Sequence, residues 1–118
     1  MSRRTEKVSS LIQIELGDRV QRKLKDPRVG FVTITHVDTA PDLKSARVYY
    51  SVLGQAKEKR EAGEGLRHAA GFLQREIAVA LKFRFTPKLT FHLDDTVEES
   101  LRIEKIIHEI HEREGKSE

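Results

Sequence analysis

The three prolines of this chain fall where its hydrophobic periodicity changes. Pro27 follows an aspartate, Pro41 lies inside the turn-like stretch 39–42, and Pro87 follows a threonine. Proline disfavours helical backbone in the residue before it and has no backbone N–H to donate, so each proline marks the end of an element or a turn. A length of 118 residues matches a single domain, and we therefore expect the segments between the prolines to pack around one core.

The first segment, residues 4–25, has the period of a helix. Its apolar residues recur at every fourth position, which places them in a row on one side of the helix: Val8, Ile12, Leu16, Val20 and Leu24. A repeat of four drifts slowly around a helix of about 3.6 residues per turn, so the row is oblique. This pattern predicts a helix that lies diagonally across a sheet.

Three other segments alternate apolar and polar residues, as strands do. They run from Phe31 to Asp38, from Lys44 to Leu53 and from Leu89 to Leu93. The connection between the first two is short, which predicts an antiparallel hairpin. The third strand follows a long helical stretch, and the pattern leaves open which edge of the hairpin it joins.

Residues 55–82 are helical in pattern but not uniform. The first part is almost wholly polar, Gly63 and Gly65 interrupt it, and the apolar period is clear from Leu66 onward. Gly71 lies inside the apolar part. Because an interior glycine weakens a helix, we expect a kink at residues 69–71 that divides the stretch into two helices.

A last helix is predicted over residues 96–113. Thr96 and Glu99 have the spacing of a capping box, and four isoleucines form one stripe: Ile103, Ile106, Ile107 and Ile110. The element order is then helix, strand, strand, helix, kink, helix, strand, helix, which predicts a two-layer α+β fold. We expect residues 1–95 to form the folded domain and residues 96–118 to form an acidic helix and tail.

The composition excludes several classes of protein. Cysteine is absent, which rules out a disulfide scaffold, thiol catalysis and a thiolate zinc site. The longest apolar run has five residues, Ile77 to Leu81, against about 20 for a membrane span. No apolar stretch follows Arg3 and Arg4, so a secretory signal is not expected. We expect a soluble cytoplasmic protein that is a monomer in solution and makes no membrane contact.

Positive charge is concentrated in the body of the chain. Residues 1–95 contain eighteen Lys and Arg against twelve Asp and Glu, whereas residues 96–118 contain four against seven. A basic body favours a polyanionic partner, of which nucleic acid is the most common. A merely solubilising surface is the alternative.

Patterns for catalysis and metal binding are weak. His108 and His111 are one turn apart in the predicted last helix, and His36 and His92 could meet on the outer face of the sheet. An ordinary exposed pair is the preferred interpretation in both cases. The glycines of residues 63–65 lack the lysine–hydroxyl ending of a phosphate-binding loop. We therefore expect no enzymatic activity, no cofactor and no metal.

One constellation points to a phosphate chain. On a helix over residues 66–82, cations and small residues fall opposite the apolar side: Arg67, Gly71, Arg75, Ala78 and Lys82. Glycine and alanine leave room for a phosphodiester backbone, and arginine offers it paired donors. If the helix breaks at Gly71, the free backbone N–H groups at the start of its second half would form a further phosphate-binding site. A solvated helix face with a tolerated glycine is the alternative.

The arrangement resembles a type II KH domain, a module that clamps RNA with a Gly-x-x-Gly loop between two helices. Here Ala69-Ala70-Gly71 stands in place of that loop, and in this the chain resembles the ribosome-binding factor A family. Other stretches agree with the family in order and spacing: DPRVGFVT at 26–33, PDL at 41–43, ARVY at 46–49, AAGFL at 69–73, RFTPKL at 84–89, and Arg102-Ile103. The resemblance covers about residues 3–107.

The resemblance implies a bacterial factor that assists assembly of the small ribosomal subunit. It implies binding to immature 30S subunits and to 16S rRNA, help with late maturation and 5′-end processing, and importance for growth in the cold. It also implies that the protein performs no catalysis itself, and it predicts a KH-like RNA-binding domain over residues 1–95.

Combined with the charge pattern, this predicts an RNA-binding surface built from the first helix and the 67–88 region. The expected contact residues are Arg3, Arg4, Lys7, Arg22, Lys25, Arg28, Arg67, Ala70, Gly71, Arg75, Lys82, Arg84 and Lys88. The alternative is a protein–protein adaptor that uses the sheet face and the isoleucine-rich last helix without binding RNA directly.

Overall fold

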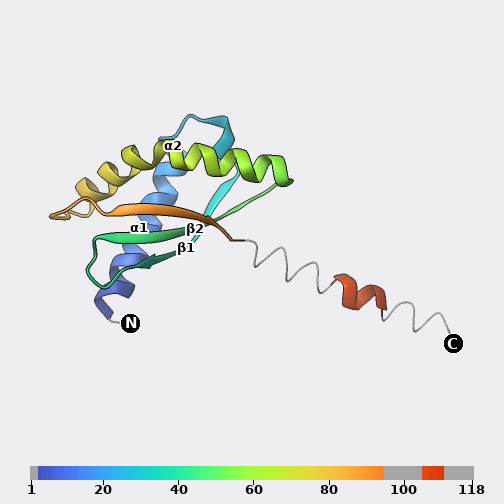
Figure 1. Cartoon of the computed structure of the whole chain (residues 1–118), viewed down its shortest axis with the longest axis horizontal. Coiled ribbons are helices and arrows are strands. Elements are labelled where there is room, and N and C mark those ends of the chain that lie inside the picture. Colours follow the sequence, from blue (N-terminus) through green and yellow to red (C-terminus); the bar gives the residue numbers. More distant parts are fainter. Residues whose placement is uncertain (1–2, 95–104, 111–118) are drawn as a thin grey trace.

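Three strands form one sheet, and two long helices pack on one of its faces (Figure 1). The computed structural model describes residues 3–94 and 105–110. In chain order the elements are α1 (Arg3–Arg22), the short 3-10 helix η1 (Pro27–Val29), β1 (Val32–Thr39), β2 (Ser45–Val52), α2 (Ala56–Ala80) and β3 (Lys88–Leu93). The predicted α+β class is confirmed, and Pro27, Pro41 and Pro87 lie outside the long helices and the strands.

The sheet has the order β1-β2-β3, with β2 in the centre. β1 and β2 pair antiparallel, which confirms the predicted hairpin, and Val32 lies opposite Val52. β3 pairs parallel to β2, with Leu89 opposite Ala46. The parallel pairing requires a crossover, and α2 provides it. The tertiary structure thus places the third strand on the β2 side of the hairpin.

One face of the sheet is buried and the other is open. Alternate residues of β2 and β3 point into the core, as strand geometry requires. In β1 the register shifts between Ile34 and His36. Because a one-residue slip exchanges the two faces, this bulge keeps Val37 and Thr39 on the buried side.

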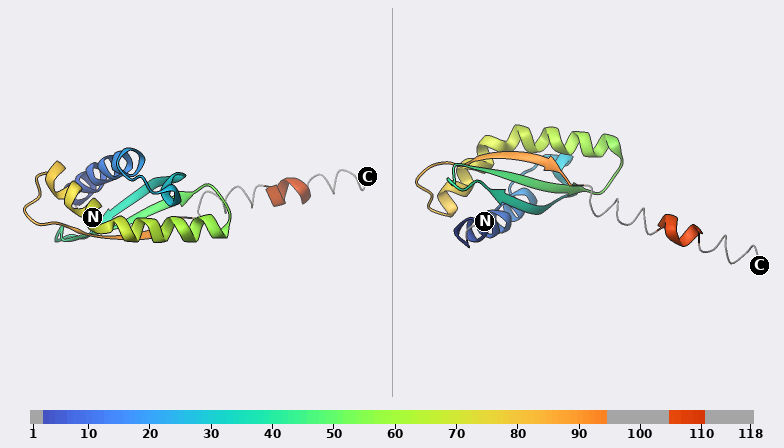
Figure 2. Two further views of the ribbon diagram at one scale, coloured as in Figure 1. Left: turned by 90° about the horizontal axis from the view of Figure 1, so that it is seen from above. Right: turned by 60° about the horizontal axis from the view of Figure 1, so that its bottom comes forward.

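The helices close the buried face with two apolar rows. α1 contributes Ile12, Leu16 and Val20, as its four-residue repeat predicted, and α2 contributes Leu66, Leu73 and Ile77. Figure 2 shows the two helices and the sheet from two further sides. An ion pair between Lys23 and Glu76 joins the end of α1 to the second half of α2.

α2 is one continuous helix from Ala56 to Ala80. The expected division into two helices at residues 69–71 is therefore wrong. Because the helix does not break, the free backbone N–H groups expected at the start of a second helix are not formed there. Figure 2 nevertheless shows the helix bending near its middle, where the ribbon passes from green to yellow. A single interior glycine weakens a helix by only about 1 kcal/mol, so Gly71 is tolerated within it.

Two glycines of α2 are needed for packing. A Cβ on Gly65 would lie 2.9 Å from Val29 Cγ1, and a Cβ on Gly63 would lie 2.8 Å from the Tyr50 hydroxyl oxygen. Both glycines are buried. They let α2 approach η1 and β2 more closely than any larger residue would.

The predicted last helix falls largely outside the described residues. Residues 105–110 are helical, and Ile106, Ile107 and Ile110 are each about half exposed. The predicted capping box of Thr96 and Glu99 and the residue Ile103 lie outside the described residues, and so do residues 111–118. The division at residue 95 stays a prediction. Among the described residues, no helix has the length and apolar character to cross a membrane.

Candidate nucleic-acid interface

The outward face of α2 carries Gly71 and Arg75 one turn apart. A Cβ on Gly71 would lie 3.5 Å from Nη1 of Arg75 and, apart from the adjacent helix backbone, would contact nothing else in the described part of the chain. Both residues are exposed, whereas Ala70 is half-buried and packs against the core. Arg75 belongs to none of the ion pairs within the described part of the chain, so its charge is available to a partner.

Arg67 is directed away from this pair. Its guanidinium lies over Gly63, with Nη1 3.2 Å from the position of a Cβ there. Arg67 lines a cavity of about 770 Å³ with Lys59, Arg60 and Tyr50. Helical side chains lean toward the N-terminus of their helix, which is why Arg67 points toward residue 63 rather than residue 71. Of the predicted row, Gly71 and Arg75 therefore lie together, whereas the Arg67 guanidinium lies near Gly63.

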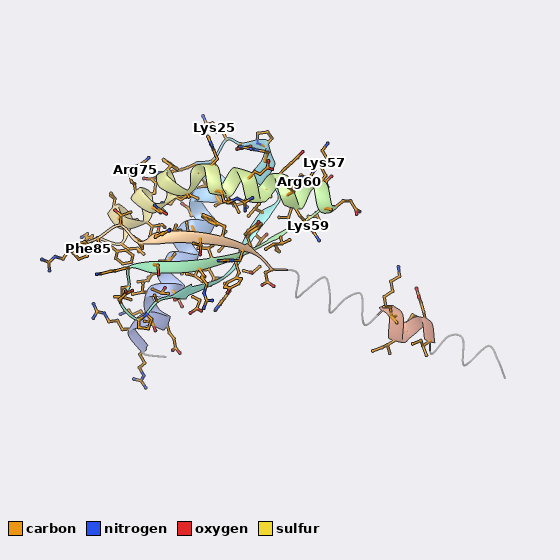
Figure 3. All side chains as sticks on the ribbon, in the orientation of Figure 1. Lys25, Lys57, Lys59, Arg60, Arg75 and Phe85 are labelled. Carbon is orange, nitrogen blue, oxygen red and sulfur yellow. The ribbon has the colours of Figure 1, made fainter. Side chains whose placement is uncertain are left out.

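Lys59 and Arg60 are basic residues outside the predicted set of contact residues. Figure 3 shows them with Lys57 at the N-terminal end of α2, and Arg75 farther along the helix. Arg60 is seven residues before Arg67, a spacing that returns to nearly the same side of a helix. Extending the helical projection from residue 66 back to residue 56 would have found it.

A second basic cluster lies where three distant segments meet. Arg4 from the first turn of α1, Lys44 from the β1–β2 turn, and Lys82 and Arg84 from the α2–β3 loop line one pocket of about 400 Å³. Arg4, Lys82 and Arg84 are predicted contact residues. Lys44 is not, because nothing local in the sequence connects it to the other three.

Two predicted cations near the end of α1 already have acidic partners. The Arg28 guanidinium donates two hydrogen bonds to the Asp26 carboxylate, from Nη2 to Oδ2 at 2.6 Å and from Nε to Oδ1 at 3.0 Å. This hydrogen bonding lowers the pKa of Asp26 and raises that of Arg28. Arg22 pairs with Asp18 at 2.9 Å. These two arginines add less positive potential than their number suggests.

The remaining predicted cations are exposed at three places. Arg3 and Lys7 lie in the first turns of α1, and Lys88 begins β3. Lys25 follows α1, and Figure 3 shows it pointing to the same side of the molecule as Arg75. The structure places Arg4 in the second basic cluster.

The two strand histidines share the open face of the sheet but do not meet. Tyr49 stands between them, with ring centroids 5.9 Å from His36 and 5.5 Å from His92. Across residues 3–94 and 105–110, no three His, Asp or Glu side chains are grouped so as to hold a metal ion. His108 lies in the described helical segment, and His111 lies outside the described residues.

The chain matches the family model described as ribosome-binding factor A over residues 4–107. The crystal structure of ribosome-binding factor A from Thermus thermophilus is similar in fold, with a TM-score of 0.67 and 22% identity, covering 75% of this chain and 94% of that one. A solution NMR structure from Thermotoga maritima, of a protein described as a putative ribosome binding factor A, has a TM-score of 0.69 and 34% identity, with coverage of 78% and 88%. A homology model of the Thermus thermophilus factor, fitted into a cryo-EM map of its complex with 30S, has a TM-score of 0.62 and 23% identity, with coverage of 73% and 90%. The match to the family model spans most of the chain, and the chain belongs to the ribosome-binding factor A family.

Proposed function

We propose that this protein is a non-enzymatic ribosome-assembly factor that binds immature 30S subunits through 16S rRNA. Membership of the ribosome-binding factor A family supports the proposal, as does the complex with 30S for which the Thermus thermophilus relative was fitted. RNA binding is assigned to residues 1–95, where the positive charge is concentrated, and the acidic segment 96–118 is assigned no RNA contact.

The single observation that carries the proposal is that exposed Gly71, which has no side chain, lies within contact distance of the exposed guanidinium of Arg75. A phosphodiester backbone can approach a helix closely only where no side chain stands in the way. The guanidinium then presents paired N–H donors to phosphate oxygens. Binding is driven largely by counterion release, so affinity falls as the salt concentration rises.

The proposed role in the cell is help with late 30S maturation and with 5′-end processing of 16S rRNA. Mispaired RNA persists longer when thermal energy is low, so a protein that holds the correct arrangement matters most in the cold. The protein supplies binding energy to this process and leaves cleavage to other factors.

Gradient sedimentation of a cell lysate tests the proposal. We expect the protein to migrate with 30S particles and to leave them in high salt or after RNase treatment. Migration with a protein complex that survives RNase would favour the adaptor alternative, for which the half-exposed Ile106, Ile107 and Ile110 are the supporting observation. Absence from 30S fractions at low ionic strength would contradict the proposed function.

A further inference from the structure

The second basic cluster forms a pocket that the helix-face interface does not use. We call it the loop pocket. Its walls come from the first turns of α1, the β1–β2 turn and the α2–β3 loop, and its residues are Arg4, Val8, Asp42, Leu43, Lys44, Lys82, Phe83, Arg84 and Phe85. The volume of about 400 Å³ lies within the range of small-ligand sites.

The charge of the loop pocket suits an anion. Four of its residues are cationic and one, Asp42, is acidic. The Asp42 carboxylate accepts the backbone N–H of Lys44 at 3.0 Å, so its first role is to shape the turn. Within the described part of the chain, none of the four cations is in an ion pair.

Phe85 gives the pocket an aromatic surface that packing does not explain. Phe83 is partly buried and packs against the core, but Phe85 is 64% exposed. Figure 3 shows Phe85 at the end of the molecule, pointing away from the sheet. The guanidinium carbon of Arg84 lies 5.7 Å from its ring centroid. An exposed aromatic ring among cations is the combination that proteins use to hold single-stranded nucleic acid.

Two residues of the pocket have left-handed backbone. Leu43 has φ of 62° and Lys82 has φ of 54°, and no other non-glycine residue among those described has a positive φ. Each turns the chain, Leu43 after β1 and Lys82 after α2. Glycine would turn the chain without strain, whereas other residues lose about 1–2 kcal/mol in this conformation. The two positions therefore carry a leucine and a lysine side chain at the pocket in spite of the strain. Strained residues of this kind concentrate at functional sites.

We propose that the loop pocket binds an unpaired nucleotide of RNA. The base stacks on Phe85, and Arg4, Lys44 and Lys82 hold the adjacent phosphates. Unpaired bases are the parts of RNA whose faces are free to stack on aromatic side chains. The inference rests on the proposed RNA-binding function and adds a preference for single-stranded segments, which the helix face around Gly71 does not supply.

Because the chain contains no tryptophan, Phe85→Trp places a single fluorophore in the pocket. We expect an oligouridylate of about ten nucleotides to quench its fluorescence, because a stacked base contacts the indole. Phe31→Trp is the matched control, since Phe31 is 70% exposed and lies outside the pocket. Equal quenching of both reporters would overturn the proposal. Stronger quenching of the Phe85→Trp protein by an acidic peptide would assign the pocket to a protein partner and overturn it as well.

Affinity measurements with the full chain separate this inference from the proposed function. Phe85→Leu should weaken binding of the oligouridylate about 5- to 100-fold while changing binding of an RNA duplex less than about twofold. Arg75→Gln should weaken both. If Phe85→Leu binds the oligouridylate as the wild type does, while Arg75→Gln still loses affinity, only the loop-pocket inference fails. If the wild-type protein binds neither RNA at low ionic strength, the proposed function fails too.

Discussion

A Cβ on Gly71 would lie 3.5 Å from Nη1 of the Arg75 guanidinium, and beyond the adjacent helix backbone no other group of the described residues lies within 4 Å of that position. The glycine therefore faces solvent and the free end of a flexible side chain. Gly63 and Gly65 differ, because they face the Tyr50 hydroxyl and the buried Val29. Gly71 is thus the glycine of α2 that packing does not require, and under the proposed function its small size admits a phosphate backbone.

Gly71→Leu should separate binding from folding. Leucine is a better helix former, so the free energy of unfolding should stay level or rise by up to about 1 kcal/mol. The added side chain keeps a phosphate away from the helix surface, and affinity for 30S particles should fall about tenfold, the loss of one charge-assisted hydrogen bond. Urea denaturation and a filter-binding assay measure the two quantities. Parallel losses of stability and affinity would assign Gly71 a structural role only.

Arg75→Gln should flatten the dependence of RNA affinity on salt. Losing one phosphate contact reduces the slope of log affinity against log salt by about 0.7–0.9. Arg47→Gln is a suitable control, because Arg47 is exposed, carries the same charge and pairs with Asp38 at 2.8 Å away from α2. An unchanged slope in a folded Arg75→Gln protein would remove Arg75 from the interface.

Gly65→Ala should destabilise the protein although alanine favours helix. Its Cβ would lie 2.9 Å from Val29 Cγ1, and Val29 is buried and cannot easily move. Overpacking costs about 1–3 kcal/mol and the gain in helix propensity is about 1 kcal/mol, so a net loss of about 1 kcal/mol is expected. Gly71→Ala should instead gain about 1 kcal/mol. Urea denaturation of the two variants compares them directly, and an equal response would show that η1 yields to the new methyl group.

The ion pair between Lys23 and Glu76 should make stability depend on acid pH. Hydrogen bonding to Lys23 lowers the pKa of Glu76 from its ordinary value of 4.5. A carboxylate with a lowered folded-state pKa stabilises the fold fully above its unfolded-state pKa, and the stabilisation is lost as the pH falls through the folded-state pKa. Between about pH 6 and pH 3, the wild type should therefore lose more stability than Glu76→Gln.

Thermal denaturation at several pH values measures this difference. Lys23→Gln serves as the second variant, because it removes the partner that lowers the pKa of Glu76. Both variants should show a shallower pH dependence than the wild type. A wild-type curve parallel to both would mean that the pair does not couple α1 to α2.

The predicted interface was only partly recoverable from helical spacing. Spacing correctly placed Gly71 and Arg75 on the outward face of α2, because positions four apart on a helix are neighbours. It also placed Arg67 with them, but the side chain folds back over Gly63. Residue spacing positions the Cα atoms, whereas a long helical side chain lies over the turn before its own Cα, so Arg75 reaches Gly71 and Arg67 reaches Gly63.

The sequence alone determined α1 and the three strands, because helical and strand periodicity and proline boundaries are local properties of the chain. The tertiary structure decided which side of the hairpin β3 joins. It also brought Arg4, Lys44 and Lys82 to one pocket from segments far apart in the chain. Whether residues from distant segments come close together depends on how the helices cross the sheet, and the packing of the whole core sets that crossing.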